Sequence, residues 1–461
     1  MRILYKPVFL FLLPTVLLAQ SQSDTQQILD RLQRLEDQNR ELMTEVRALR
    51  QELASRETGP QTPAAAATAA AQQPATPSGA TETPPLEERV AVNEQRIDEM
   101  NQSKVEADHK FPIHLTGMLL FNAFANGRNS GGQEYPTVAS PTSGSATDGA
   151  TLRQSVLGLT FDGPNLIWGG KASGSLYMDL WGGSGSSLNQ LMRLRVATLD
   201  LAWTNTTFSV GQDKPIIAPR EPTSLAQVGV SPLTGAGNLW LWAPQARIEQ
   251  RFKFGDSTGL RAQFGVYETN ESGNAAPAGY IQGSARPGIE GRFELWHKFG
   301  DERRIEIAPG FHTSQSHVDG TTVPSRVFSL DWLIRPAGIV DFTGAFFTGE
   351  NVGVLGGLRQ GISIDEYDQI HATSSTGGWA QLTLRATSRL SFNIYGGQEN
   401  DRASDLIAGG ISRNLMYAGN VMYRLAPNIL ASFEASEART MYIGTGLRLN
   451  PHYDIALAYM Y

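Results

Sequence analysis

The alternation of apolar and polar residues in the C-terminal part of the chain constrains the fold more than any other feature. In the last ten residues, from His452 to Tyr461, every second side chain from Tyr453 onward is apolar or aromatic. Successive side chains of a β-strand point to opposite faces, so this pattern indicates a strand with one apolar face. A strand of a soluble β-sandwich shows the same pattern, and this segment alone does not separate the two interpretations.

The same alternation recurs from Phe111 onward, in segments near the length of about ten residues that a tilted strand needs to cross a bilayer. Turn-forming residues separate the segments, and the chain contains 47 glycines. We count about sixteen strands if 428–443 is one strand and 444–451 is a loop. A separate strand at 440–450 gives an odd number, which would place the two ends on opposite sides of the membrane. The sequence therefore predicts an all-β transmembrane barrel of about 16 antiparallel strands over 111–461.

The two faces of these strands differ in charge. In the segment 324–336, Phe328 and Trp332 lie on one face, whereas Asp331 and Arg335 lie on the other. A charge that faces lipid at mid-depth costs about 2–4 kcal/mol, so we expect the charged face to line the lumen. A barrel of this size encloses water rather than a packed side-chain core.

The N-terminal part of the chain has a different character. Residues 1–19 begin with basic residues, continue with a short apolar run and end on a small residue, which predicts a secretory signal peptide. Residues 24–57 carry a seam with alternating steps of four and three, which predicts an α-helical coiled coil that joins several copies of the chain. The seam residues are Ile28, Leu32, Leu35, Asn39, Leu42, Val46, Leu49 and Leu53. A single amphipathic helix packed on a globular core is the alternative.

Two further segments connect this coiled coil to the barrel. Residues 58–85 are rich in Ala and Pro and almost without charge, which predicts a flexible linker. Residues 86–104 repeat the four-three step briefly and predict a short second coiled coil. Together these segments predict a stalk in the periplasm, beneath the barrel.

Composition and motifs argue against several classes of function. The net charge of −7 and the lack of basic stretches argue against binding to nucleic acid. The seven histidines show no metal-ligand spacing, and the chain has no cysteine for a disulfide framework or a lipid anchor. No catalytic motif stands out, so we expect no enzyme activity, no cofactor and no metal site.

Charged residues at lumen-facing positions are the candidate functional residues. They come from two predicted strands, 190–204 and 245–254, and from the uncommonly long connection between them, 213–244. We expect this connection to fold inward and narrow the channel; an external loop over the barrel mouth, or a contact with another subunit, is the alternative. The predicted pore-lining residues are Arg193, Arg195, Arg220, Arg247, Glu249 and Arg251.

Guanidinium groups beside a constriction favour anions, because they stay protonated and bind a carboxylate through two hydrogen bonds. The alternative is a ladder in which Glu249 and Glu290 neutralise these arginines along a wet wall. The first arrangement predicts selective handling of anions or carboxylates, and the second predicts general diffusion.

The order of a signal peptide, a coiled coil, a Pro/Ala-rich tether and a barrel resembles the DcaP-like trimeric porins of Gram-negative outer membranes. The resemblance is carried by the heptads from Ile28 to Leu53, by Arg193-Leu194-Arg195, by Phe208-Ser209-Val210-Gly211-Gln212 and by Pro244-Gln245-Ala246-Arg247. It implies a homotrimer in outer-membrane lipid that takes up small, often dicarboxylate, solutes through a basic constriction. The implied constriction residues are Arg193, Arg195, Arg247 and Arg251, while the long tether and the second coiled coil depart from the family.

These observations predict an outer-membrane porin for the passive diffusion of small hydrophilic solutes, anionic or neutral, with a bias toward anions and carboxylates. One alternative is a structural protein that tethers the outer membrane to periplasmic material through its stalk. Another is an outer-membrane hydrolase, which requires a Ser/His pair that converges at the barrel surface.

Overall fold

The computed structural model describes residues 112–183, 190–271, 282–364, 367 and 369–461. The predicted N-terminal segments lie outside the described residues and stay predictions: the signal peptide 1–19, the coiled coils 24–57 and 86–104, and the linker 58–85. Within the described residues, no helix combines the length and the apolar character that crossing a membrane requires.

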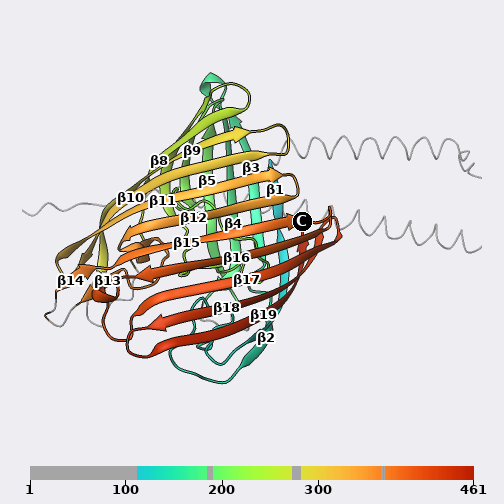
Figure 1. The fold of residues 1–461 in the computed structure, drawn as a ribbon. Helices are drawn as coiled ribbons and strands as arrows, with labels where there is room; N and C mark the ends of the chain where they lie inside the picture. The colour runs from blue at the N-terminus through green and yellow to red at the C-terminus, as the bar shows by residue number, and fades with distance from the viewer. Residues whose placement is uncertain (1–111, 184–189, 272–281, 365–366, 368) are drawn as a thin grey trace, which may run out of the picture. The chain divides into compact units, whose positions relative to one another are not determined.

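One large antiparallel sheet accounts for most of the described chain (Figure 1). Its strands are β1 (Ile113–Asn126), β2 (Thr147–Thr151), β3 (Val156–Asn165), β4 (Lys171–Gly182), β5 (Leu191–Ala202), β6 (Thr206–Asp213), β7 (Ala243–Lys253), β8 (Thr258–Tyr267), β9 (Gln282–Lys298), β10 (Arg304–Val318), β11 (Thr321–Ala337), β12 (Val340–Glu350), β15 (Ser374–Arg385), β16 (Leu390–Asp401), β17 (Ile411–Ala426), β18 (Ile429–Tyr442) and β19 (Gly446–Met460). The short strands β13 (Ile362–Ile364) and β14 (Ile370–Ala372) form a separate pair.

The sheet closes on itself because the first and last strands pair. β1 and β19 run antiparallel, from Met118 opposite Met460 to Asn126 opposite His452. Closure joins the two ends of the sheet, which a sheet needs in order to span a membrane. The strand predicted at the end of the chain is present as part of β19, and this strand closes the barrel.

Next to β1, two short strands, β2 and β3, together take the place of one strand of the barrel wall. β2 pairs with β1 over Asn122–Asn126, and β3 pairs with the same strand over Ile113–Met118. The 17 strands of the sheet thus form a barrel with sixteen positions, as the sequence predicts. β2 lies near the end of the connection between β1 and β3. Its sequence, Thr-Asp-Gly-Ala-Thr, lacks the apolar alternation that marks the other strands.

The C-terminal hairpin corrects the prediction of a loop at 444–451. β19 begins at Gly446, which pairs with Tyr442, so only three residues form the turn. Gly444 and Gly446 have φ angles of +87° and +74°, a backbone region that L-residues with side chains rarely adopt. The two glycines therefore permit a tight turn where the sequence indicated a longer connection.

The faces of the strands follow the predicted division between lipid and lumen. On β19 the side chain of Ile455 is 61% exposed, whereas Asp454 is 2% exposed. On β11 Phe328 is 48% exposed, whereas Asp331 is 1% exposed. The exposed side chains are apolar and face outward, and the buried polar side chains face the lumen.

An arginine on the outer face is expected to destabilise the barrel according to its depth. Ile455→Arg, near the middle of β19, should lower the free energy of unfolding by about 2–4 kcal/mol, because the charge lies in hydrocarbon. Leu447→Arg, on the same face near the end of the strand, should cost only about 0–1 kcal/mol. Urea unfolding in lipid vesicles measures both values. Equal costs at the two positions would contradict the assignment of this face to lipid.

Candidate functional site in the barrel lumen

The connection between β6 and β7 lies inside the barrel. We call residues 214–242 the inner segment. The Ile216 N–H donates to Glu290 on β9 at 2.6 Å, and the Thr223 N–H donates to Gln381 on β15 at 2.7 Å. The Ser224 hydroxyl donates to Glu434 on β18 at 2.7 Å. Partners on three separate parts of the wall show that the segment crosses the lumen, so the predicted inward fold is confirmed and the external loop is excluded.

Amide side chains of the wall satisfy much of the backbone of the inner segment. The Gln154 side chain lies in the break between β2 and β3; it donates to the Ala226 carbonyl and accepts from the Val228 and Gly229 N–H groups. Asn122 on β1 donates to the Leu225 carbonyl at 2.9 Å. A buried backbone group without a partner costs free energy, so these amides hold an irregular segment in place without secondary structure.

Apolar contacts and glycines allow the inner segment to pack closely against the wall. Leu233 is fully buried in a cluster that includes Trp379 on β15. The backbone approaches the wall very closely at Gly237, where an added Cβ would collide with the Gly378 carbonyl. On β16 a Cβ at Gly397 would collide with the Ala236 carbonyl. This part of the lumen is therefore filled with protein, which narrows the passage.

Ion pairs join the inner segment to one side of the lumen. We call this group the arginine wall, which consists of Arg220, Arg251, Arg261, Arg292, Arg304, Arg335 and Arg385 with Glu249, Glu294, Glu306, Asp331 and Asp341. Arg220, from the inner segment, lies 2.6 Å from both Asp331 and Glu306. Arg292 on β9 lies 2.7 Å from Asp331 and from Glu294.

Exposure differs between the two signs of charge in the arginine wall. The side chain of Arg251 is 52% exposed and that of Arg385 is 40% exposed. The carboxylates of Glu294 and Asp341 are 5% and 9% exposed. Seven arginines meet five carboxylates within this group, so guanidinium groups outnumber carboxylates in the described wall, and Arg292 is the one arginine of the group that is fully buried.

Arg220 stays charged in this setting. Burial alone would lower the pKa of Arg220, but Asp331 and Glu306 outweigh this effect and raise the pKa above its ordinary value. A buried guanidinium with paired carboxylates is stable only while all partners remain, because one unpaired buried charge is costly. The arginine wall is therefore a strong anchor for the inner segment.

The remaining predicted pore residues lie on the same inner face in separate pairs. Arg193 and Arg195 both approach Asp179 on β4, at 2.6 and 3.8 Å, and both stack over the Trp242 ring. Arg247 pairs with Asp213 at 2.8 Å. The structure thus brings Arg220, Glu249 and Arg251 into the arginine wall and leaves Arg193, Arg195 and Arg247 outside it.

Sequence reasoning missed Arg261, Arg292 and Glu294 as members of this site. The signal was present on β9, because Phe293 and Leu295 face outward, so that Arg292 and Glu294, which alternate with them, must face inward. Every predicted arginine has a carboxylate partner, as in the alternative of a charge ladder. Of the two carboxylates expected in that ladder, Glu249 pairs with Arg251, whereas Glu290 contacts His312 instead of an arginine. Arginines still outnumber carboxylates in the arginine wall. This surplus is the only part of the predicted basic constriction that the ion pairs leave.

Carboxylates without basic partners occupy another part of the lumen wall. Glu399, Glu434 and Asp454 lie on β16, β18 and β19, and within the described residues none of them forms an ion pair. Amides and hydroxyls hold them instead: Asn420 donates to Glu434 at 2.9 Å, and Asn122 donates to Asp454 at 3.0 Å. The lumen therefore has an arginine-rich side and a side that carries buried acids.

A Ser-His-Glu arrangement, which a hydrolase would require, is present but sealed. His312 lies 2.8 Å from the Ser314 hydroxyl through Nε2 and 3.0 Å from Glu290 through Nδ1. The three residues are at most 2% exposed, and Tyr267 packs edge-on against the histidine. No substrate reaches this hydroxyl, whereas Glu290 accepts the Ile216 N–H. The arrangement therefore positions the inner segment.

Comparisons with known proteins agree with this architecture. No protein-family model and no curated protein matches the chain. The outer membrane channel DcaP of Acinetobacter baumannii is similar in structure, with a TM-score of 0.63 and 14% identity over 76% of this chain and 97% of that one. An anion-selective porin from Comamonas acidovorans has a TM-score of 0.51 and 12% identity over 76% and 99% of the two chains. At these identities the likeness shows the fold alone, and the predicted resemblance to the DcaP-like fold is confirmed.

Removing a buried arginine from the arginine wall should destabilise the barrel far more than removing an exposed one. Arg292→Ala leaves Asp331 and Glu294 with one guanidinium fewer in a buried site, so the free energy of unfolding should fall by about 3–5 kcal/mol. Arg251→Ala, as the exposed control, should cost less than about 1 kcal/mol. Urea unfolding followed by heat-dependent gel mobility measures both. Similar losses for the two variants would argue against a buried network.

Proposed function

We propose that the chain forms an outer-membrane porin for the passive diffusion of small hydrophilic solutes. The observation that carries the proposal is a closed barrel with an apolar exterior whose charged lumen is narrowed, at one level, by the inner segment. Support comes from two solved structures with this fold, a channel and a porin. Diffusion through a pore has no chemical step, so it requires no catalytic group.

We propose a bias toward anions and carboxylates on the strength of the arginine wall. Its five carboxylates are at most 13% exposed, whereas Arg251 and Arg385 are 52% and 40% exposed, so the charges that a passing solute meets on this wall are mainly cationic. A cavity of about 430 Å³ at this wall has four cationic side chains and three carboxylates in its lining: Arg251, Lys253, Arg261 and Lys298 with Asp256, Glu294 and Glu306. Exposed guanidinium groups bind carboxylates through paired hydrogen bonds, which favours anions without a permanent binding site.

The proposal places the barrel in outer-membrane lipid as a homotrimer, with the predicted stalk in the periplasm. The resemblance to trimeric porins and the heptad seam from Ile28 to Leu53 support this assembly. A structural tether is the second candidate, and the apolar packing of Leu233 and Leu239 inside the barrel favours it. Single-channel conductance separates the two, because a filled lumen carries no steady open current.

Charge removal from the arginine wall should weaken anion preference. Arg251→Ser removes the most exposed guanidinium of the wall, so the anion-to-cation permeability ratio should fall by about twofold, as expected for an exposed charge worth a few tenths of a kcal/mol. Reversal potentials in asymmetric salt, with chloride and with small carboxylates, measure this ratio. Arg439→Ser on the outer face of β18 is the control and should change nothing. An unchanged reversal potential in Arg251→Ser would contradict the proposed selectivity.

Releasing the inner segment should widen the pore. Arg220→Ala removes the ion pairs that tie this segment to Asp331 and Glu306, so single-channel conductance and its fluctuations should both increase. Lys214→Ala is the matched control, because Lys214 pairs with Glu221 within the same segment. Planar-bilayer recordings give both quantities. Identical traces from the two variants would show that the inner segment does not limit the passage.

A further inference from the structure

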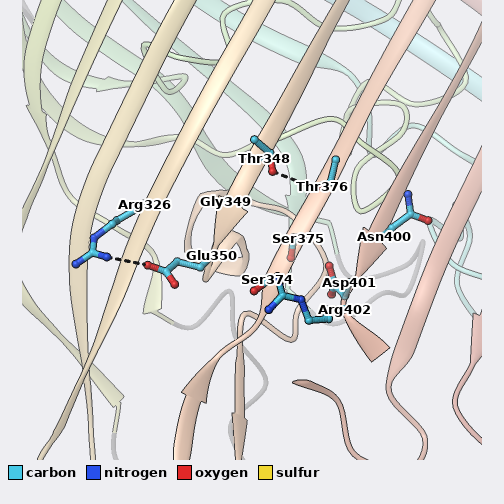
Figure 2. Close-up of a pocket in the computed structure, with 10 residues that line it drawn as sticks. All are labelled: Arg326, Thr348, Gly349, Glu350, Ser374, Ser375, Thr376, Asn400, Asp401 and Arg402. Atoms are coloured by element: carbon cyan, nitrogen blue, oxygen red, sulfur yellow. Dashed lines mark hydrogen bonds and ion pairs between the residues drawn. The ribbon is translucent and has the colours of Figure 1, made fainter. Parts of the chain in front are cut away.

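The outer face of the barrel carries a polar groove that the channel function does not use. We call it the rim groove; its volume is about 470 Å³, and it spans β11, β12, β15 and β16. Figure 2 shows the side chains around it, among them Arg326, Thr348, Glu350, Thr376, Asn400 and Arg402. The long connections 351–373 and 402–410 adjoin it, which places it at the mouth opposite the short turns.

The rim groove begins where the apolar exterior ends. Phe328 lies two residues from Arg326 on the same face of β11 and is 48% exposed. Phe346 lies two residues from Thr348 on β12 and is 38% exposed. Two residues of a strand span about 6–7 Å, so the groove lies within one side-chain length of the apolar band. This is the level at which lipid headgroups meet the hydrocarbon of a membrane.

Two arginines beside the groove lack a counter-charge. Arg326 pairs with Glu350 at 3.5 Å, but Arg402 and Arg413 form no ion pair with any described residue. Arg413 on β17 lies opposite Asn400 in the sheet register, and Arg402 follows Asn400 by two residues. The lining contains two carboxylates: Glu350, which pairs with Arg326, and Asp401, which is 4% exposed and accepts from Gln360. Asp405, just beyond Arg402, accepts from the Ser374 N–H. Like charges on neighbouring strands repel each other, so this corner of the groove favours an anion.

The rest of the groove offers neutral hydrogen-bonding groups. The hydroxyls of Thr348 and Thr376 lie 3.0 Å apart, and in the sheet register Asn400 lies between Thr376 on β15 and Arg413 on β17. Hydroxyls and amides both donate and accept hydrogen bonds, which suits the hydroxyls of a sugar. Guanidinium groups suit a phosphate, and the apolar side chains below the groove suit acyl chains.

We propose that the rim groove binds the phosphorylated sugar headgroup of an outer-leaflet lipid. The phosphate lies between Arg402 and Arg413, the sugar contacts Asn400, Thr348 and Thr376, and the acyl chains lie along the apolar exterior. This binding requires a barrel in a membrane but not the transport of a solute, so it stands apart from the proposed channel function.

Lipid binding by the purified full-length protein tests this proposal. Native mass spectrometry in detergent counts lipids per barrel during titration with an acylated glucosamine disaccharide that carries two phosphates, and with its dephosphorylated form. We expect Arg402→Ser/Arg413→Ser to weaken binding of the phosphorylated lipid by about tenfold or more, because each charged hydrogen bond to phosphate is lost. The dephosphorylated lipid should bind all proteins equally weakly.

Matched variants separate lipid binding from misfolding. Arg303→Ser/Arg389→Ser removes two exposed arginines from turns at the opposite mouth and should bind like the wild type. Arg402→Lys/Arg413→Lys keeps the charge and should retain most of the affinity. Single-channel conductance should be the same in all variants.

Three results would overturn the proposal. The first is unchanged affinity in Arg402→Ser/Arg413→Ser. The second is inorganic phosphate that competes with the lipid at equal concentration, which would indicate a site for small anions. The third is a change of oligomeric state in this variant with unchanged lipid binding, which would assign the groove to a contact between copies of the chain.

Discussion

The exclusion of charge from hydrocarbon is the constraint on which the whole barrel depends. A strand in this wall has only two faces, and the outer one must be apolar where it meets hydrocarbon, so the charged residues at that depth have to lie inside. Asp331 and Ile455 illustrate the two outcomes, one buried in the lumen and the other exposed to the outside. Charges crowd together in the lumen for this reason, and their pairing is the direct consequence.

That crowding explains why the lumen holds an irregular segment so firmly. Arg220 enters a site where Asp331 and Glu306 already need partners, and Gln154 supplies bonds at a break in the wall itself. Side chains that face a wet interior have capacity for additional hydrogen bonds, which a regular hydrophobic core does not offer. A loop of almost thirty residues without secondary structure is thus stabilised by its surroundings rather than by its own propensity.

Alternation alone predicted the barrel, its strand number and the direction of most side chains, because the period of two is set by backbone geometry. It failed where glycines allowed a turn of three residues after Tyr442, and where β2 had no apolar side chains to mark it. The inward course of the inner segment was predicted from its length, but the contacts that hold it against the wall were not. Bonds such as Asn122 to Leu225 join residues 103 positions apart, and their partners depend on the register of the entire sheet.

The pairing of Arg261 and Arg292 with Glu294 lay beyond sequence reasoning for the same reason. Each residue was on a predictable face, but which charge meets which depends on the stagger between β8, β9 and β11. One shared carboxylate therefore links arginines from separate strands, which no local pattern records.

Gly237 and Gly397 influence the width of the passage, and this influence does not depend on charge. Any side chain at either position would push the inner segment away from the wall. The width of the passage therefore depends on the absence of a side chain at these two positions. In the proposed channel, charge decides which solutes enter, and the absence of side chains at these two glycines decides how wide the opening is. Selectivity and size limit can therefore change independently over evolutionary time, each through its own small set of positions.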